Sequence, residues 1–333
     1  MGDRPIVVAG AGSIGCFVGG ILADASRRVA LLARPRVIAE IDRFGLTLTS
    51  FEGSSWHLAS QQIGLSDDPQ ILADASVVLV TVKSADTAEM ADIIARHAPV
   101  DAVVVSLQNG VANAPLLRDR LPGRAVLAAM VPFNVIAAGE GRYRRATSGD
   151  IAIERDKADT AARLSVPALA MRATDDIPGV QWGKLLVNLN NAINALSGLP
   201  LREQLAHRDW RGLFADQIAE GLVAVRAEGI DPVSPTPVPS SWTPRLLRLP
   251  DALFAMVLAI AMRIDPQARS SMWEDLERHR GTEIDYLQGV IIEIAGRHGL
   301  QVPISRRIVA LIREAEAAGQ GSPRLTVEQI RKG

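Results

Sequence analysis

The sequence predicts an α/β fold in which an N-terminal Rossmann-type, doubly wound sheet is followed by an all-α C-terminal domain. Near the N-terminus, a glycine-rich turn separates a short apolar run from a helical stretch, and further short apolar runs recur up to residue 131. Long stretches of helical periodicity replace them after Gln181. A chain of 333 residues exceeds what one hydrophobic core usually supports, so we expect two domains, 1–180 and 181–333.

The N-terminal half contains short apolar runs with the length of buried parallel strands. These runs are Ile6–Ala9, Val29–Leu32, Val77–Val82, Val103–Leu107 and Val126–Val131. The first opens onto Gly10-Ala-Gly12-Ser-Ile-Gly15, and a helical stretch, Cys16–Ala25, leads to the second. Strand, glycine turn, helix and strand in this order predict a parallel βαβ unit.

The glycine turn predicts a dinucleotide-binding site, because it follows a strand and opens a helix. Gly10 would permit the tight turn, Gly12 the approach of a pyrophosphate, and Gly15 close packing of the helix. The helix N-terminus, at Ser13 and Ile14, would offer backbone N–H groups and partial positive charge to the phosphates. The alternative is a purely structural glycine turn.

The end of the second strand favours NADP(H) over NAD(H). NAD-binding proteins place Asp or Glu about 20 residues after the first glycines, where it bonds the ribose 2′-hydroxyl. This chain has Ala33-Arg34-Pro35-Arg36 there, and a guanidinium can bind a 2′-phosphate that a carboxylate would repel. Alternatively, Arg34 and Arg36 are solvated loop charges.

The C-terminal half is expected to be helical. Its predicted helices are Trp182–Leu196, Asp209–Glu228, Pro250–Met262, Glu274–His298 and Ile304–Ala318. Between two of them, Asp231–Pro250 contains six prolines, which exclude a regular helix. We expect a connecting loop there, with a mobile flap or a subunit-exchange arm as alternatives. The apolar run Ala252–Met262 leaves open a homodimer through the helical domain.

One face of the first of these helices carries the candidate substrate residues. At about 100° per residue, Lys184, Asn188 and Asn191 share this face, opposite a row of apolar side chains. Asn is a mediocre helix former, so its recurrence beside a lysine favours ligand binding over a merely solvated face. Asn194 competes with Asn191 for the second asparagine position.

A second candidate segment begins at Ser270. Ser271 and Glu274 have the spacing of a helix-initiating capping box. Glu283 precedes a mostly apolar helix, and a carboxylate so close to buried surface needs a partner, for which Lys184 is the natural candidate.

These residues resemble the ketopantoate reductase (2-dehydropantoate 2-reductase) family along nearly the whole chain. The matching pieces are GAGSIG at 10–15, Arg34, VTVKS with Lys83, LQNGV with Asn109, the helix with Lys184 and Asn188, and SSMWEDLERHRGTEIDYLQG at 270–289. The last is the most specific of them.

The resemblance implies NADPH-dependent reduction of a 2-keto acid, in the family's case ketopantoate to pantoate in pantothenate and coenzyme A biosynthesis. Lys184 would protonate the carbonyl oxygen, and Glu283 would bond that oxygen or the lysine. Asn109 and Lys83 would lie near the cofactor, with Asn109 also reaching the substrate, which Ser271, Asn188 and Asn191 would bind. A further asparagine expected in Gly198–Leu205 is absent, which leaves the substrate's identity less certain than the reaction type.

Other readings of the sequence remain open: a related enzyme acting on a different 2-keto acid, a β-hydroxyacid dehydrogenase, or a non-catalytic NADP sensor. The net charge of −1 argues against nucleic-acid binding, and one cysteine with five scattered histidines argues against a metal site. No targeting segment and no apolar run long enough to cross a membrane is evident, so we expect a cytoplasmic location.

Overall fold

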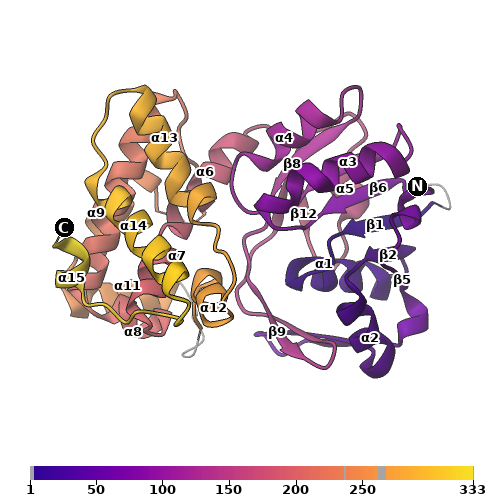
Figure 1. Cartoon of the computed structure of the whole chain (residues 1–333), viewed down its shortest axis with the longest axis horizontal. Helices are drawn as coiled ribbons and strands as arrows, with labels where there is room; N and C mark the ends of the chain where they lie inside the picture. The colour runs from indigo at the N-terminus through magenta and orange to yellow at the C-terminus, as the bar shows by residue number, and fades with distance from the viewer. Residues whose placement is uncertain (1–3, 236–237, 262–267, 333) are drawn as a thin grey trace. The chain divides into compact units, whose positions relative to one another are not determined.

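The computed structural model describes residues 4–235, 238–261 and 268–332. The chain divides into two compact units, Met1–Ile177 (unit 1) and Pro178–Gly333 (unit 2), drawn in Figure 1. Unit 1 is built around β-sheets, and unit 2 is helical in its described residues. The predicted fold class, an α/β unit followed by an all-α unit, is confirmed.

Unit 1 contains an eight-stranded sheet in the order β12-β11-β8-β7-β6-β1-β2-β5. All five predicted runs form strands of this sheet and pair in parallel with one another, although three end one or two residues earlier than expected. The antiparallel pairing of β11 with β8 interrupts the parallel order. The strands are β1 (Ile6–Ala9), β2 (Val29–Leu32), β5 (Gly64–Ser66), β6 (Val77–Val80), β7 (Val103–Ser106), β8 (Val126–Met130), β11 (Ile151–Glu154) and β12 (Met171–Thr174).

Both faces of this sheet are buried, which explains why its central strands are apolar without alternation. Val8 of β1 belongs to a core cluster that includes Phe17 of α1, whereas Val7 belongs to a second cluster that includes Ile94 of α3 and Leu117 of α4. Alternate strand residues therefore supply two cores. The helices of unit 1 are α1 (Ser13–Asp24), α2 (Pro35–Phe44), α3 (Thr87–His97), α4 (Asn113–Arg120) and α5 (Thr160–Leu164).

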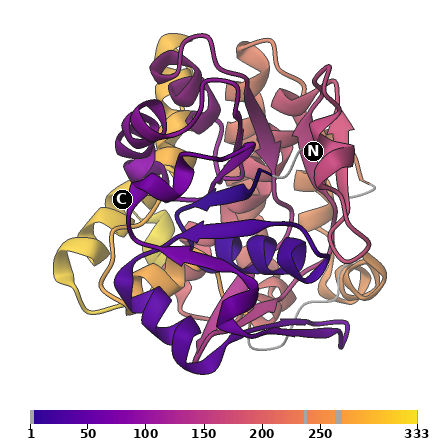
Figure 2. The same ribbon diagram turned by 90° about the vertical axis from the view of Figure 1, so that its right-hand side faces the viewer.

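A second, four-stranded sheet in unit 1 was not predicted. Its order is β4-β3-β10-β9, formed by β3 (Leu46–Ser50), β4 (Ser55–Leu58), β9 (Val135–Gly139) and β10 (Arg142–Arg145). Helix α1 lies between the two sheets, as Figure 2 shows. A Cβ on Gly19 would lie 2.7 Å from Leu31 of the large sheet, and one on Gly20 would lie 2.7 Å from Leu46 of the small sheet. These two glycines therefore let both sheets pack closely on α1.

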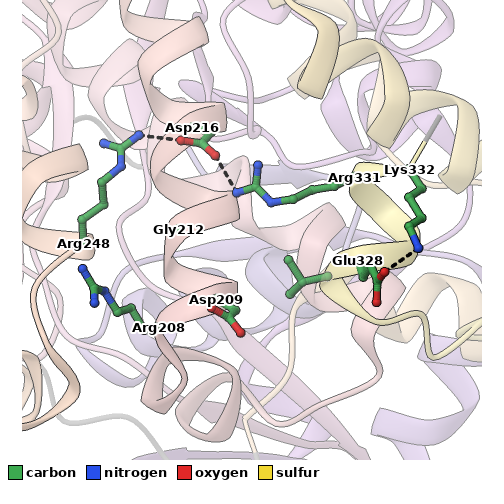
Figure 3. Close-up of a pocket in the computed structure, with 9 residues that line it drawn as sticks. Arg208, Asp209, Gly212, Asp216, Arg248, Glu328, Arg331 and Lys332 are labelled. Atoms are coloured by element: carbon green, nitrogen blue, oxygen red, sulfur yellow. Dashed lines mark hydrogen bonds and ion pairs between the residues drawn. The ribbon is translucent and has the colours of Figure 1, made fainter.

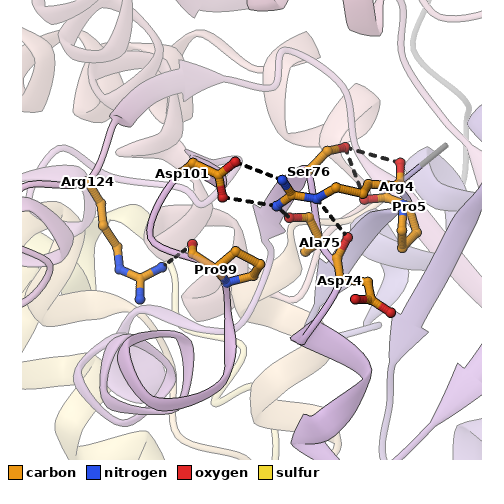
Figure 4. Close-up of polar contacts among 8 residues, drawn as sticks. All are labelled: Arg4, Pro5, Asp74, Ala75, Ser76, Pro99, Asp101 and Arg124. Carbon is orange, nitrogen blue, oxygen red and sulfur yellow. Dashed lines mark hydrogen bonds and ion pairs between the residues drawn. The ribbon is translucent and has the colours of Figure 1, made fainter. Parts of the chain in front are cut away.

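Arg4 joins the amino ends of three neighbouring strands (Figure 4). Its guanidinium donates to the carbonyl oxygens of Asp74 and Ala75, just before β6, and to both carboxylate oxygens of Asp101, just before β7. The same guanidinium lowers the pKa of the Asp101 carboxyl group. These contacts lie at the edge of the sheet opposite the glycine turn, so we assign them a role in the fold.

The described residues of unit 2 form α-helices, of which the first begins at the unit boundary. They are α6 (Ile177–Asn188), α7 (Asn190–Ser197), α8 (Leu201–Ala206), α9 (Arg208–Ala227), α10 (Thr243–Leu247), α11 (Asp251–Ala261), α12 (Ser271–Glu277), α13 (Val290–Arg297), α14 (Pro303–Ala318) and α15 (Val327–Arg331). A π-helical turn, Asp285–Gly289, precedes α13.

The predicted helix Trp182–Leu196 is found as two consecutive helices, α6 and α7, which meet at Leu189, where the backbone keeps helical angles (φ −55°, ψ −29°). The buried side chain of Gln288, in the π-helical turn, donates from Nε2 to the carbonyl oxygen of Leu189 at 2.9 Å. A side chain that bonds a helix carbonyl is a known cause of helix kinks. The partner is 99 residues away in the chain, so local periodicity could not reveal it.

The predicted helix Glu274–His298 is wrong as a single element. Helix α12 ends at Glu277, and His279 then adopts a left-handed conformation with φ of 51°. The N–H of Arg280 bonds the carbonyl oxygen of Asp275, and the N–H of His279 bonds that of Leu276. This is the hydrogen-bond pattern of a Schellman C-cap, which usually has glycine at the left-handed position.

The segment 231–250 contains a helix, α10, although its six prolines were expected to exclude one. Pro244 lies in the first turn of α10, where proline is tolerated because its missing N–H would have no partner within the helix. Helix α11 follows at Asp251–Ala261, and Met262, the predicted end of that helix, lies outside the described residues. Among the helices described, none is long and apolar enough to cross a membrane.

Candidate functional site

In unit 1, the predicted cofactor residues follow the carboxyl ends of four adjacent parallel strands. Strands β7, β6, β1 and β2 are neighbours in the sheet. The glycine turn follows β1, Arg34 follows β2, Lys83 follows β6 and Asn109 follows β7. The chain runs from β1 to β2 and β5 on one side and then crosses back to β6 on the other side of β1. Open α/β sheets bind ligands at this kind of switch point.

Two glycines of the turn are required by the protein's own packing. Gly10 has a φ of +96°, and a Cβ there would lie 2.4 Å from Cγ1 of Val82. A Cβ on Gly15 would lie 2.6 Å from Oγ1 of Thr81, whose hydroxyl donates to the carbonyl oxygen of Gly10 at 2.6 Å. The turn after β1 is thus pressed against the end of β6.

Gly12 has a different environment. A Cβ built there meets no protein atom within 4 Å, so packing in unit 1 does not require glycine. Gly12 is the N-cap of α1 and supplies no capping side chain, while Ser13 and Ile14 begin the helix. The first N–H groups of a helix have no partner within it. Open space at the Cα of Gly12, the residue just before these N–H groups, fits the approach of a phosphate.

Arg34 is the N-cap of α2, and Pro35 is the first residue of that helix. Its side chain is 86% exposed, and its nearest ion-pair partner, Asp86, is 3.9 Å away. An exposed pair at this distance is weak, so the guanidinium is available to an anion with little energetic loss. A 2′-phosphate would have to compete with the Asp86 carboxylate, which sequence reasoning did not anticipate.

A buried polar network joins the loops that carry Lys83 and Asn109, and sequence reasoning missed it. Asn113 donates from Nδ2 to Oγ of Ser84 at 3.0 Å and to the carbonyl oxygen of Asn109 at 2.7 Å. Thr87 donates to Oδ1 of Asn113 at 2.9 Å. Lys83 and Asn109 themselves are exposed. The network therefore fixes the loop backbone at Asn109 and the residue after Lys83, the two loops from which these exposed side chains extend.

Gln108 extends the network to the end of β6. Its Nε2 donates to Oγ1 of Thr87 at 2.7 Å and to the carbonyl oxygen of Val82 at 3.1 Å. Ser106 donates to Oε1 of Gln108 at 3.0 Å. The signal in the sequence was the group of small polar residues that follows each of the two strands.

In unit 2, Lys184 lies in the middle of α6, with Asn188 one turn further along. The Lys184 residue is partly exposed, yet burial lowers the pKa of its amine from 10.5 to about 8. Asn188 is buried, with 8% of its surface exposed. An amine with a pKa near neutrality can hold or release a proton at physiological pH.

The structure distinguishes Asn191 from Asn194. Asn194 is fully buried, and its Nδ2 donates to the carbonyl oxygen of Leu199 and to Oε1 of Gln204, while its Oδ1 accepts from the N–H of Ser270. Its polar atoms are thus engaged within the protein. Asn191 is partly exposed, so it is the better candidate for the second asparagine.

The predicted capping box at Ser271 is wrong by one residue. The N-cap of α12 is Ser270, whose Oγ accepts from the N–H of Trp273. The same Oγ donates to the carbonyl oxygen of Asn191 at 2.9 Å. The buried Ser270 therefore caps the helix, which leaves the exposed Ser271 unnecessary for capping and places it close to Asn191.

Glu283 lies on a segment that is fixed at both ends. The N–H of Thr282 bonds Oε1 of Glu316 at 2.7 Å, and Asp285 pairs with Arg313 at 2.7 Å. Gln288 bonds the chain where α6 meets α7. The segment is thus held against α14 on one side and against the end of the Lys184 helix on the other.

A surface pocket of about 640 Å³ lies elsewhere in unit 2, between α9 and the C-terminal α15 (Figure 3). Asp216 pairs there with both Arg248 and Arg331, and Glu328 pairs with Lys332. Most of its charges therefore neutralise one another, and we assign it no ligand. Within the described part of the chain, no group of His, Cys, Asp and Glu side chains could hold a metal ion.

Comparisons with known proteins give the same family for both units of the chain. Residues 6–157 match the model of ketopantoate reductase PanE/ApbA, and residues 176–316 match that of its C-terminal domain. A Halobacterium salinarum protein named 2-dehydropantoate 2-reductase is 28% identical over 323 residues, which cover 94% of this chain and 99% of that protein.

Solved structures give the same result. The crystal structure of a PanE/ApbA family ketopantoate reductase from Ralstonia eutropha JMP134 is 31% identical, with a TM-score of 0.81, and the match covers 95% of this chain and 99% of that one. A D-mandelate dehydrogenase, solved with NADH and anilino(oxo)acetate, has a TM-score of 0.77 at 19% identity and covers 95% and 99%. At that identity the likeness concerns the fold alone.

Proposed function

The chain belongs to the ketopantoate reductase family, and on that premise we propose that it reduces a 2-keto acid to a 2-hydroxy acid with NADPH. The favoured substrate is 2-dehydropantoate, the compound named in the relatives' activity. The observation that carries the proposal is the amine of Lys184, whose pKa burial lowers to about 8. The reaction requires a proton donor at neutral pH, and this group fits that requirement.

The cofactor site in the proposal consists of the residues at the carboxyl edge of the large sheet. The N–H groups at Ser13 and Ile14 would bind the pyrophosphate in the space left open at Gly12. The exposed guanidinium of Arg34 would bind the 2′-phosphate and so favour NADPH over NADH. Lys83 and Asn109 would contact the cofactor from the loops that the Asn113 network holds.

A bound nicotinamide would supply hydride to the carbonyl carbon of the substrate. As negative charge develops on the carbonyl oxygen, the Lys184 ammonium stabilises it and donates the proton that completes the hydroxyl group. Glu283 would accept a hydrogen bond from that ammonium or from the new hydroxyl group. The amides of Asn188 and Asn191 and the hydroxyl of Ser271 would bind the substrate's polar groups.

An NADPH-oxidation assay over a panel of 2-keto acids tests this proposal. The panel comprises 2-dehydropantoate, pyruvate, 3-methyl-2-oxobutanoate and phenylglyoxylate, each with NADPH and with NADH. We expect the highest kcat/KM for 2-dehydropantoate with NADPH. A strong preference for phenylglyoxylate or for a 3-hydroxy acid in the reverse direction would refute the substrate assignment.

Two variants test the assigned roles. Lys184→Ala is expected to bind NADPH as the wild type does and to lose turnover, a result that a non-catalytic NADP sensor would not give. Arg34→Glu removes the proposed contact with the 2′-phosphate. Charge-assisted hydrogen bonds contribute about 1.5–3 kcal/mol, so NADPH should bind about 10- to 100-fold more weakly while NADH binding changes little.

A further inference from the structure

The beginning of the proline-rich segment lies directly on the helix that carries Lys184. The N–H of Val233 donates to the carbonyl oxygen of Gly179 at 2.9 Å, one turn before Gly183 in α6. A Cβ on Gly183 would lie 1.7 Å from the carbonyl oxygen of Val233 and 2.6 Å from its carbonyl carbon. The backbone of Val233 therefore occupies the space that any side chain at position 183 would need.

The segment 231–235, which we call the strap, has a restricted backbone. Pro232 and Pro235 each fix their own φ, and a residue that precedes proline, here Ser234, is confined to extended conformations. Ser240 donates to the carbonyl oxygen of Pro232 at 2.8 Å, which ties the strap to the start of the next turn. Pro232 is buried, and Val233 remains 44% exposed. The strap thus presents an apolar side chain on a stiff support.

Val233 and Lys184 lie on neighbouring parts of the α6 surface. At about 100° per residue, the order around the helix is Gly183, Val187, Lys184 and Asn188. Val187 is partly exposed and separates the strap from the lysine. Around α6, the Val233 backbone at Gly183 is therefore followed by the apolar side chain of Val187, then by an amine and then by an amide.

We propose that the strap is a fixed wall of the substrate site, with Val233 and Val187 contacting the apolar substituent of a 2-keto acid whose carbonyl oxygen lies at Lys184. This inference rests on the proposed function and adds a determinant of specificity to it. A 2-keto acid has a polar end, the carboxylate and carbonyl group, and a substituent on its carbonyl carbon. The surface has the matching order, with polar side chains at one end and valines at the other.

The strap also accounts for the environment of the lysine. The strap lies on α6 at Gly183, with Val187 between it and Lys184, so the strap and Val187 together remove water from one flank of the lysine, which agrees with the lowered pKa of its amine. Gly183 is essential in this arrangement, because a methyl group there would push the Val233 backbone away by more than about 1 Å to reach ordinary van der Waals separation.

Steady-state kinetics of Val233→Ala and of the wild type test the specificity role. The substrates are 2-dehydropantoate, which has a branched substituent, and pyruvate, which has a methyl group. One or two methyl groups in an apolar pocket are worth about 10-fold or more in discrimination. We expect the ratio of kcat/KM for 2-dehydropantoate to that for pyruvate to fall about 10-fold, mainly through a higher KM for 2-dehydropantoate.

Gly183→Ala and Gly212→Ala form a matched pair that tests the support of the strap. Both replace a glycine within a helix, but a Cβ on Gly212 would meet only the end of the Arg331 side chain at 4.0 Å. We expect Gly183→Ala to raise KM for 2-dehydropantoate at least 10-fold and to move the pH profile of turnover upward, as water reaches Lys184. Gly212→Ala should behave as the wild type.

The outcomes separate the two proposals. If the wild type reduces 2-keto acids but Val233→Ala keeps the wild-type substrate ratio, the strap is no wall of the site and this inference alone is wrong. If Gly183→Ala does not fold, the substrate ratios of Val233→Ala and of the bulkier Val233→Phe still decide. A wild type that reduces no 2-keto acid would overturn the proposed function, and the inference would fall with it.

Discussion

Replacing Lys184 by methionine should stabilise the protein at neutral pH. Burial lowers the pKa of the amine from 10.5 to about 8, so the folded state binds this proton less tightly than the unfolded chain does. Below pH 8 both states are protonated, and the folded state bears the full penalty of a buried ammonium. A pKa difference of this size corresponds to about 3 kcal/mol, and because Lys184 is partly exposed we expect about 2 kcal/mol.

The sign of the pH dependence follows from proton binding. Between pH 8 and 10.5 the unfolded chain holds more protons than the folded one, so the stability of the wild type rises with pH across this window. Methionine has a similar length and no charge, so the variant lacks this dependence. Its advantage of about 2 kcal/mol at pH 7 should therefore disappear by about pH 10.5.

Urea unfolding followed by tryptophan fluorescence, at several pH values from 6.5 to 10.5, measures this difference. Lys157→Met is the control, because Lys157 is an exposed lysine of unit 1 and its replacement should show no such trend. A Lys184→Met variant that is less stable than the wild type at pH 7, or a difference that stays constant with pH, would show that burial does not disfavour the ammonium.

From the lowered pKa of Lys184 we also predict how the rate of turnover depends on pH. Reduction of a keto acid needs the ammonium form of Lys184 as proton donor, whereas oxidation of the hydroxy acid needs the free amine. The rate of reduction should therefore fall as pH rises through about 8, and the rate of oxidation should rise over the same range. Initial rates in the two directions check this, and parallel pH profiles would contradict the role assigned to the lysine.

Five further substitutions give distinct expectations. Gln288→Met leaves the buried carbonyl of Leu189 without its donor and should lower the free energy of unfolding, measured in urea, by about 1–3 kcal/mol. Gln217→Met removes buried amide atoms that have no hydrogen-bond partner, so it should be neutral or stabilising. Equal effects of the two substitutions would refute the role of the Gln288 bond. Asn113→Ala breaks the network between the two cofactor loops and should weaken NADPH binding, measured by calorimetry, while Asn113→Ser should weaken it less. Gly12→Ala should leave the free energy of unfolding within about 0.5 kcal/mol of the wild type, because a Cβ there meets no protein atom. It should weaken NADPH binding at least about 10-fold. Unchanged binding would exclude a phosphate at this turn.

The sequence was sufficient to predict five of the eight strands of the large sheet and the helical C-terminal half, but not β5, β11 and β12. Runs such as Ile6–Ala9 and Val29–Leu32 are apolar at every position because both faces of their sheet are buried, and this pattern is visible without any partner. The small sheet escaped prediction because its strands depend on distant pairing. β3 and β10 lie about 95 residues apart in the chain, and β10, Arg-Tyr-Arg-Arg, has no apolar pattern, so the short Leu and Thr alternation of β3 has no visible partner.

For the candidate site, the types of residue could be predicted, but their environments could not. Periodicity placed Lys184, Asn188 and Asn191 on one helix face. At Leu189, where α6 meets α7, the carbonyl oxygen accepts a hydrogen bond from Gln288, and no local sequence pattern could indicate a partner 99 residues away. The burial and internal hydrogen bonds of Asn194 favour Asn191 as the second asparagine, a choice that the sequence alone left open. The pKa of an amine and the partners of an amide depend on atoms brought together only by folding, so the tertiary structure decided them.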